Sequence, residues 1–63
     1  MKKYTTYEIK IAFEQYKERH EVVYRAAAEG IEYVRDSALK RFWGDYGGLP
    51  NLRIHHITIT EYN

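Results

Sequence analysis

Apolar and polar residues alternate near the start of the chain in the pattern of a half-buried β-strand. Tyr7, Ile9, Ile11 and Phe13 share one parity, and the residues between them are mostly charged. In an extended chain, successive side chains point to opposite faces. We therefore predict a strand over residues 7 to 13 whose odd-numbered side chains face the core.

A second β-rich stretch follows over residues 20 to 25. His20, Val22, Tyr24 and Ala26 share one parity there, although the exposed side is interrupted by an apolar residue. Val and Tyr favour strands because they pack well on a pleated surface. We predict that this stretch is the hairpin partner of the first strand.

The connection between these two strands has weak turn chemistry. Residues 14 to 19 are polar but include no Gly, Asn, Asp or Pro, and their local propensity leans toward helix. Apolar residues from Phe13 to Phe42 also recur at spacings of three and four. One long helix over that range therefore remains an alternative to the hairpin.

The segment from Ala27 to Trp43 has the pattern of an amphipathic helix. Its apolar stripe consists of Ile31, Val34, Ala38, Leu39 and Phe42. Charged residues occupy the opposite side, and a glycine-rich segment with a proline follows. We expect the helix to close before Tyr46.

The last strand is predicted over residues 52 to 62, which are rich in β-branched side chains. Its parity slips once, because Leu52 and Ile54 are even-numbered whereas Ile57 and Ile59 are odd-numbered. A β-bulge at His55-His56 would let both pairs face one core.

The order of these elements predicts an α+β fold, with residues 1 to 63 forming a single compact ββαβ domain. A right-handed crossover through the helix places the last strand beside the first, which gives a three-stranded antiparallel sheet in the order 2-1-3. The helix covers one face and leaves the other open. Such a short chain, at 7.6 kDa, has a thin core. A homodimer formed over the open face would add to this core.

Composition narrows the range of partners. Ten Lys and Arg residues balance nine Asp and Glu residues, so the formal charge is only +1, too even for a strongly cationic nucleic-acid or membrane binder. The chain has no cysteine, no long apolar run and no apolar segment typical of a secretion signal at its start. We expect a soluble cytoplasmic protein.

Catalytic and metal-binding patterns are weak. His55 and His56 are adjacent, and neighbours in a strand point to opposite faces, so they can share an ion only if the bulge turns them together. Ser37 is the only serine and has no base at a suggestive spacing. The carboxylates Glu29 and Glu32 lie on a charged helix face. We expect a non-enzymatic protein without metal or cofactor.

Nucleic-acid binding is a secondary possibility. Exposed tyrosines on an open sheet can stack bases, and three candidates for this role lie near basic residues. The tyrosines are Tyr4, Tyr16 and Tyr24, and the basic residues are Lys2, Lys3, Lys10 and Arg25. Glutamates interleaved with these positions would repel phosphate.

The residues best suited to bind a protein partner gather near the end of the predicted helix. Tyr, Trp and Arg side chains carry much of the energy of protein interfaces, and seven of the ten aromatic residues are Tyr. The candidate partner-binding residues are Arg35, Lys40, Arg41, Trp43 and Tyr46, with Tyr16 and Tyr24. Trp43 either anchors a partner or covers the core beside Phe42.

The layout resembles that of a known group of proteins. A hairpin that ends at residues 22 to 27, a helix that includes residues 29 to 35 and a lone terminal strand are similar to the minimal ββαβ inhibitors encoded by phages and mobile elements. This group includes a coliphage inhibitor of bacterial RNA polymerase and compact anti-CRISPR proteins. The polymerase inhibitor is strongly acidic, so the mixed charge of this chain fits an anti-CRISPR role better.

The resemblance implies a small inhibitor that acts in the bacterial host cytoplasm. It would bind a bacterial protein or nucleoprotein complex, such as a CRISPR effector, and block it sterically. A structural dimerisation module is a further alternative.

Overall fold

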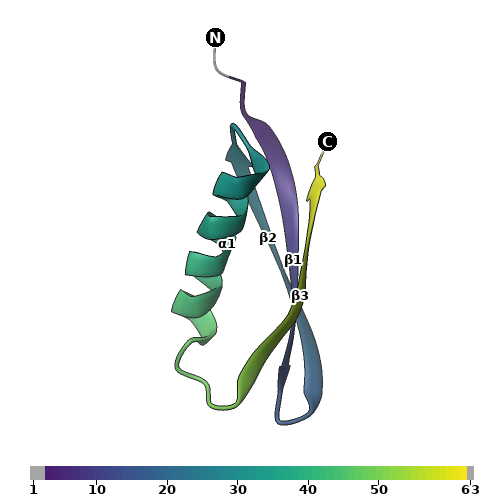
Figure 1. Cartoon of the computed structure of the whole chain (residues 1–63), viewed down its shortest axis with the longest axis vertical. Helices are drawn as coiled ribbons and strands as arrows, with labels where there is room; N and C mark the ends of the chain where they lie inside the picture. Colours follow the sequence, from purple (N-terminus) through teal and green to yellow (C-terminus); the bar gives the residue numbers. More distant parts are fainter. Residues whose placement is uncertain (1–2, 63) are drawn as a thin grey trace.

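The computed structural model describes residues 3 to 62 and has the predicted architecture. The elements in chain order are β1 (Thr5–Gln15), β2 (Glu18–Ala28), α1 (Ile31–Tyr46) and β3 (Leu52–Glu61). The strands form an antiparallel sheet in the order β2-β1-β3, and α1 lies against one face (Figure 1). The predicted α+β fold and strand order are confirmed. Lys2, a basic residue considered for nucleic-acid binding, lies outside the described residues.

The β1–β2 hairpin excludes the single long helix over residues 13 to 42. Both strands are longer than predicted, and their pairing continues to Gln15 opposite Glu18. The turn consists of Tyr16 and Lys17 alone, with φ values of 51° and 67°. Two successive positive φ angles define a type I′ turn, which matches the twist of paired strands. Neither residue favours this conformation, so pairing along the whole hairpin outweighs the weak turn chemistry.

Glycine at position 17 should stabilise the protein. Lys17→Gly removes the Cβ that disfavours a positive φ, and we expect a gain of about 1 kcal/mol in the free energy of unfolding. Lys17→Ala is the matched control, because it also removes the long side chain but keeps the Cβ. Urea unfolding of both variants would measure the difference. Equal stabilities would contradict the turn assignment.

α1 is displaced toward the C-terminus relative to the predicted segment from Ala27 to Trp43. Ala27 and Ala28 pair with β1 and extend β2, and the extended backbone of Gly30 precedes the first helical turn. The helix also continues through Gly44 to Tyr46, so the expectation that it closes before Tyr46 is wrong.

Packing explains the late helix end. Tyr46 is half-buried, and its ring lies 5.2 Å from that of Phe13 and 5.1 Å from that of Phe42. Those contacts offset the cost of a glycine in the last turns, which is about 1 kcal/mol relative to alanine. The N–H of Gly47 then donates to the carbonyl of Trp43 at 2.8 Å and closes the helix.

The bulge in β3 occurs where the change in parity predicts it. Ala12 pairs with His56, and the next residue of β1, Phe13, pairs with Ile54, so His55 is the additional residue. The bulge restores the alternation. Leu52, Ile54, Ile57 and Ile59 consequently all pack toward the core on the helix side.

The core lies between α1 and the inner face of β1 and β2. Its buried side chains are Tyr7, Ile9, Ile11, Phe13, Tyr24, Val34, Ala38 and Phe42. Two residues of the predicted apolar stripe of the helix are not fully buried, since Ile31 is 49% exposed and Leu39 is half-buried. The main contacts of α1 are with β2 and β1, so the helix covers β3 less completely than the other two strands. The molecule is elongated, with extents of 46 × 19 × 13 Å.

Candidate protein-binding surface

Five ring side chains form an aromatic cluster near the end of α1: Phe13, His20, Phe42, Trp43 and Tyr46. Phe13 is central, with ring centroids 5.4 Å from His20 and 5.2 Å from both Phe42 and Tyr46. Aromatic pairs at these separations contribute beyond the area they bury. The cluster therefore fixes this end of α1 to the hairpin.

Trp43 is the most prominent exposed member of the aromatic cluster. Its ring contacts Phe42 edge-on at 5.2 Å, while 47% of the residue remains exposed. Trp43 thus covers the core beside Phe42 with one edge and presents the rest to solvent, while its role as an anchor for a partner stays a prediction. A large side chain that is held rigidly before binding loses little entropy when a partner covers it.

Two further exposed side chains lie at the same end of the molecule. Tyr16, in the hairpin turn, is 61% exposed, and Leu49, in the loop after α1, is 43% exposed. The turn and the loop both lie at the lower end in Figure 1, and Gln15 Nε2 donates to the carbonyl of Pro50 at 3.3 Å between them. We call Tyr16, Trp43 and Leu49 the hairpin-end surface.

Tyr24 does not contribute to this surface, and the expectation that it is exposed is wrong. It pairs with Ile9 on the helix side of the sheet and is 7% exposed. Its hydroxyl donates to Asp45 Oδ2 at 3.0 Å. The guanidinium of Arg41 lies over its ring at 4.9 Å, so Arg41 has an intramolecular contact as well.

The environment of Tyr24 raises the pKa of its hydroxyl. Burial raises the pKa of its hydroxyl, and the hydrogen bond to Asp45 raises it further, from 10.0 to about 12. A pKa that folding raises adds stability that is fully present below the unfolded value and is lost as the pH rises through the folded value. The window here is therefore pH 10 to pH 12.

Tyr24→Phe should remove the one tyrosine that ionises near pH 12. We expect the ultraviolet titration of the wild type to include a tyrosinate signal near pH 12 that the variant lacks. The stability of the wild type should also fall more steeply than that of Tyr24→Phe between pH 10 and pH 12. Titration curves that differ only near pH 10 would contradict the buried Tyr24–Asp45 contact.

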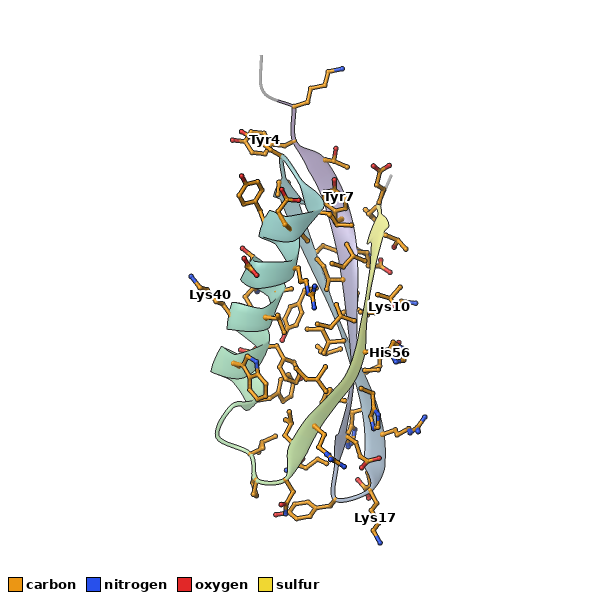
Figure 2. The ribbon with its side chains drawn as sticks, viewed as in Figure 1. Tyr4, Tyr7, Lys10, Lys17, Lys40 and His56 are labelled. Atoms are coloured by element: carbon orange, nitrogen blue, oxygen red, sulfur yellow. The ribbon has the colours of Figure 1, made fainter. Side chains whose placement is uncertain are left out.

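The remaining predicted residues lie apart from one another. Arg35 lines a groove with Ile57 and Ile59 on the β3 side of α1. Lys40 is exposed and projects away from the sheet (Figure 2). Of the seven predicted partner-binding residues, Trp43, Tyr16 and the half-buried Tyr46 lie toward the hairpin end.

The open face of the sheet is mostly polar, although the exposed Val23 also lies on it. Arg25 Nη2 lies 3.4 Å from Glu8 Oε2 and also covers the ring of Tyr62 at 4.1 Å, while His55 Nε2 lies 3.3 Å from Glu14 Oε1. Nucleic-acid bases could not stack on Tyr24, because its ring faces the core. Tyr4 instead lines a hollow on the helix side (Figure 2). The tyrosines considered for stacking therefore do not form one surface on this face.

The bulge brings His55 and His56 to the same face. His55 contacts Glu14, and His56 pairs with Ala12, which also lies on the open face. Neighbours in a regular strand would point to opposite faces, but the bulged residue His55 lets both histidines point to the open face. Among residues 3 to 62, no group of three His, Cys, Asp or Glu side chains could hold a metal ion.

Two features were missed by sequence reasoning. His20 joins the aromatic cluster, which its shared parity with Tyr24 could have indicated. The second feature is the hollow between β2 and α1, whose walls include Tyr4 and Tyr33. The run of three alanines at residues 26 to 28 was its available signal, because short side chains leave space beneath a helix.

Over residues 3 to 62, no helix is long and apolar enough to cross a membrane. Comparison with known proteins gave no match: no family model fits the chain, and no curated protein or solved structure is similar to it at a significant level.

Proposed function

We propose that this chain is a small non-enzymatic inhibitor that binds a bacterial protein or nucleoprotein complex and blocks it sterically. The observation that carries the proposal is Trp43, a tryptophan backed by a packed aromatic cluster and nearly half exposed. In the free protein, the apolar surface of such a side chain is exposed to water, which is unfavourable. In a complex the same surface is buried against the partner, and tryptophan is accordingly enriched in binding hot spots.

The surroundings of Trp43 support this role. Tyr16 and Leu49 are further exposed apolar side chains toward the hairpin end, while Lys40 and Lys17 are exposed charged residues of the helix and the turn. An apolar centre with a charged rim is the usual composition of a protein interface. Because both rim residues are lysines, electrostatic steering would favour an acidic patch on the partner. The class of target, a CRISPR effector, is proposed from the similarity in layout to phage inhibitors.

Capture from a bacterial lysate tests the binding surface. We expect Trp43→Ala to lose a stoichiometric partner that the wild type retains, because truncation of an interface tryptophan costs at least about 2 kcal/mol, or roughly 30-fold in affinity. Tyr33→Ala is the matched control, since Tyr33 is a helical aromatic residue of 61% exposure near the opposite end of α1. Capture that is unaffected by Trp43→Ala would contradict the proposal.

A second experiment tests the target class. The chain should inhibit DNA cleavage by a purified guide-loaded CRISPR effector at equimolar concentration, and Trp43→Ala should not. Fluorescence anisotropy with short single strands provides the contrast. Tight, salt-sensitive binding to free nucleic acid without inhibition of any protein would favour the nucleic-acid-binding alternative.

A further inference from the structure

The outer edge of β3 is the part of the described structure that best fits a second copy of this chain. In the order β2-β1-β3, β3 has a neighbour on one side only. The N–H of Tyr62 donates to the carbonyl of Thr6 at 2.8 Å, and antiparallel ladders alternate between inward-bonded and outward-facing residues. The backbone groups of Ile57, Ile59 and Glu61 therefore face away from β1.

This edge lacks the usual protection against strand pairing. Residues 56 to 60 read His-Ile-Thr-Ile-Thr, without Lys, Arg, Asp, Glu or Pro. Edge strands that remain unpaired commonly carry such residues, or a bulge, at the exposed position. The bulge at His55 precedes the segment and leaves it regular. The edge strand on the other side, β2, carries charges at Glu18, Arg19, Glu21 and Arg25.

The inner side of the same segment is apolar and only partly covered. Ile57 and Ile59 line the groove between β3 and α1, and Ile31, which is 49% exposed, lies on its helix side. Glu32, Arg35 and Asp36 border the groove, so its rim carries both signs of charge. A patch with both signs can be complementary to itself across a two-fold axis.

We propose that two copies of this chain pair antiparallel through β3, with the two-fold axis at Thr58. Ile57 of one copy then lies opposite Ile59 of the other, and the outward-facing backbone groups of each pair bond to each other. Thr58 meets Thr58 of the second copy on the open face. The four isoleucines form one apolar strip between the two grooves, within a continuous six-stranded sheet.

This pairing does not depend on the proposed inhibitory function. Residues 57 to 61 form the upper half of β3 in Figure 1, whereas the hairpin end lies at the lower end of the molecule. Trp43 and Tyr16 therefore remain exposed in the pair. A failure of the pairing would leave the binding proposal intact, and the reverse also holds.

Thr58→Glu tests the axis. In the single chain, the exposed Thr58 lies beside Lys10, so the new carboxylate gains an opposite charge. In the dimer, the two substituted glutamates lie directly opposite each other, and their like charges destabilise the association. Val23→Glu is the matched control, because exposed Val23 is the neighbour of Lys10 on the β2 side. Circular dichroism would establish that both variants fold.

Sedimentation equilibrium from micromolar to millimolar concentration gives the result. The wild type should reach twice the 7.6 kDa chain mass. Thr58→Glu should weaken association at least about tenfold, and Val23→Glu should change it less than about twofold. The amide protons of Ile57 and Ile59 should also become protected from exchange as association proceeds. A single-chain mass throughout, equal effects of both substitutions, or unchanged protection at these amides would overturn the pairing.

Discussion

Phe42→Ala is expected to unfold most of the protein at room temperature. Phe42 is fully buried and contacts the rings of Phe13, Trp43 and Tyr46. Truncation of a buried phenylalanine typically costs about 3–5 kcal/mol, because it loses apolar burial and leaves a cavity. A domain of this length has a total stability of roughly 3–9 kcal/mol. The loss is thus comparable to the whole stability of the fold.

The measurement is far-ultraviolet circular dichroism during urea unfolding, with Lys40→Ala as the matched control. Lys40 lies on the same helix but is exposed, so its truncation should change stability by less than about 0.5 kcal/mol. A Phe42→Ala variant with a wild-type unfolding midpoint would show that the aromatic cluster does not hold α1 on the sheet. Phe42→Leu should recover part of the loss.

Deletion of Thr58 should be strongly destabilising, whereas deletion of His55 should be tolerated. Removal of the bulged residue His55 leaves Leu52, Ile54 and Ile57 on one parity, so every apolar side chain of β3 still faces the core. Only its exposed contact with Glu14 is lost, which contributes at most about 1 kcal/mol.

Deletion of Thr58 instead puts Ile57 and Ile59 on opposite parities. Either one isoleucine turns to the open face or His56 is forced inward, and we expect a loss of about 2–4 kcal/mol. Thermal unfolding of the two deletion variants measures the contrast directly. Equal stabilities would contradict the register between β1 and β3.

The fold was predictable because its strands carry clear binary patterns. The alternation from Tyr7 to Phe13 is sufficient to identify β1, and the change in parity between Ile54 and Ile57 is sufficient to locate the bulge. The central part of the helix stripe, including Val34 and Phe42, was also predictable, because it combines buried positions at helical spacing.

The element boundaries depend on contacts that the local sequence does not reveal. Ala27 and Ala28 favour a helix in isolation, but Thr6 and Thr5 offer them strand partners. Gly44 is a helix-breaking signal, yet the packing of Tyr46 carries the helix past it. In each case a long-range contact overrides a local preference.

The candidate site was only partly predictable for a similar reason. Composition and position singled out Trp43, and its exposure agrees with the proposed role. Tyr24 was predicted to lie on the surface as a candidate for base stacking and partner binding, although its parity with Val22 placed it inward. Asp45 satisfies that hydroxyl from the far end of α1. A hydrogen bond over 21 residues cannot be inferred from either segment alone.

The central claim is that Trp43 contacts the target in the inhibited complex, and its uniqueness in the sequence allows a direct test. Labelling with 5-fluorotryptophan gives a single ¹⁹F resonance from this position. On titration with the captured target or a guide-loaded CRISPR effector, we predict that the resonance shifts or broadens up to equimolar ratio and loses its sensitivity to solvent deuteration. A complex that forms while this resonance keeps its position, width and solvent sensitivity would contradict the claim.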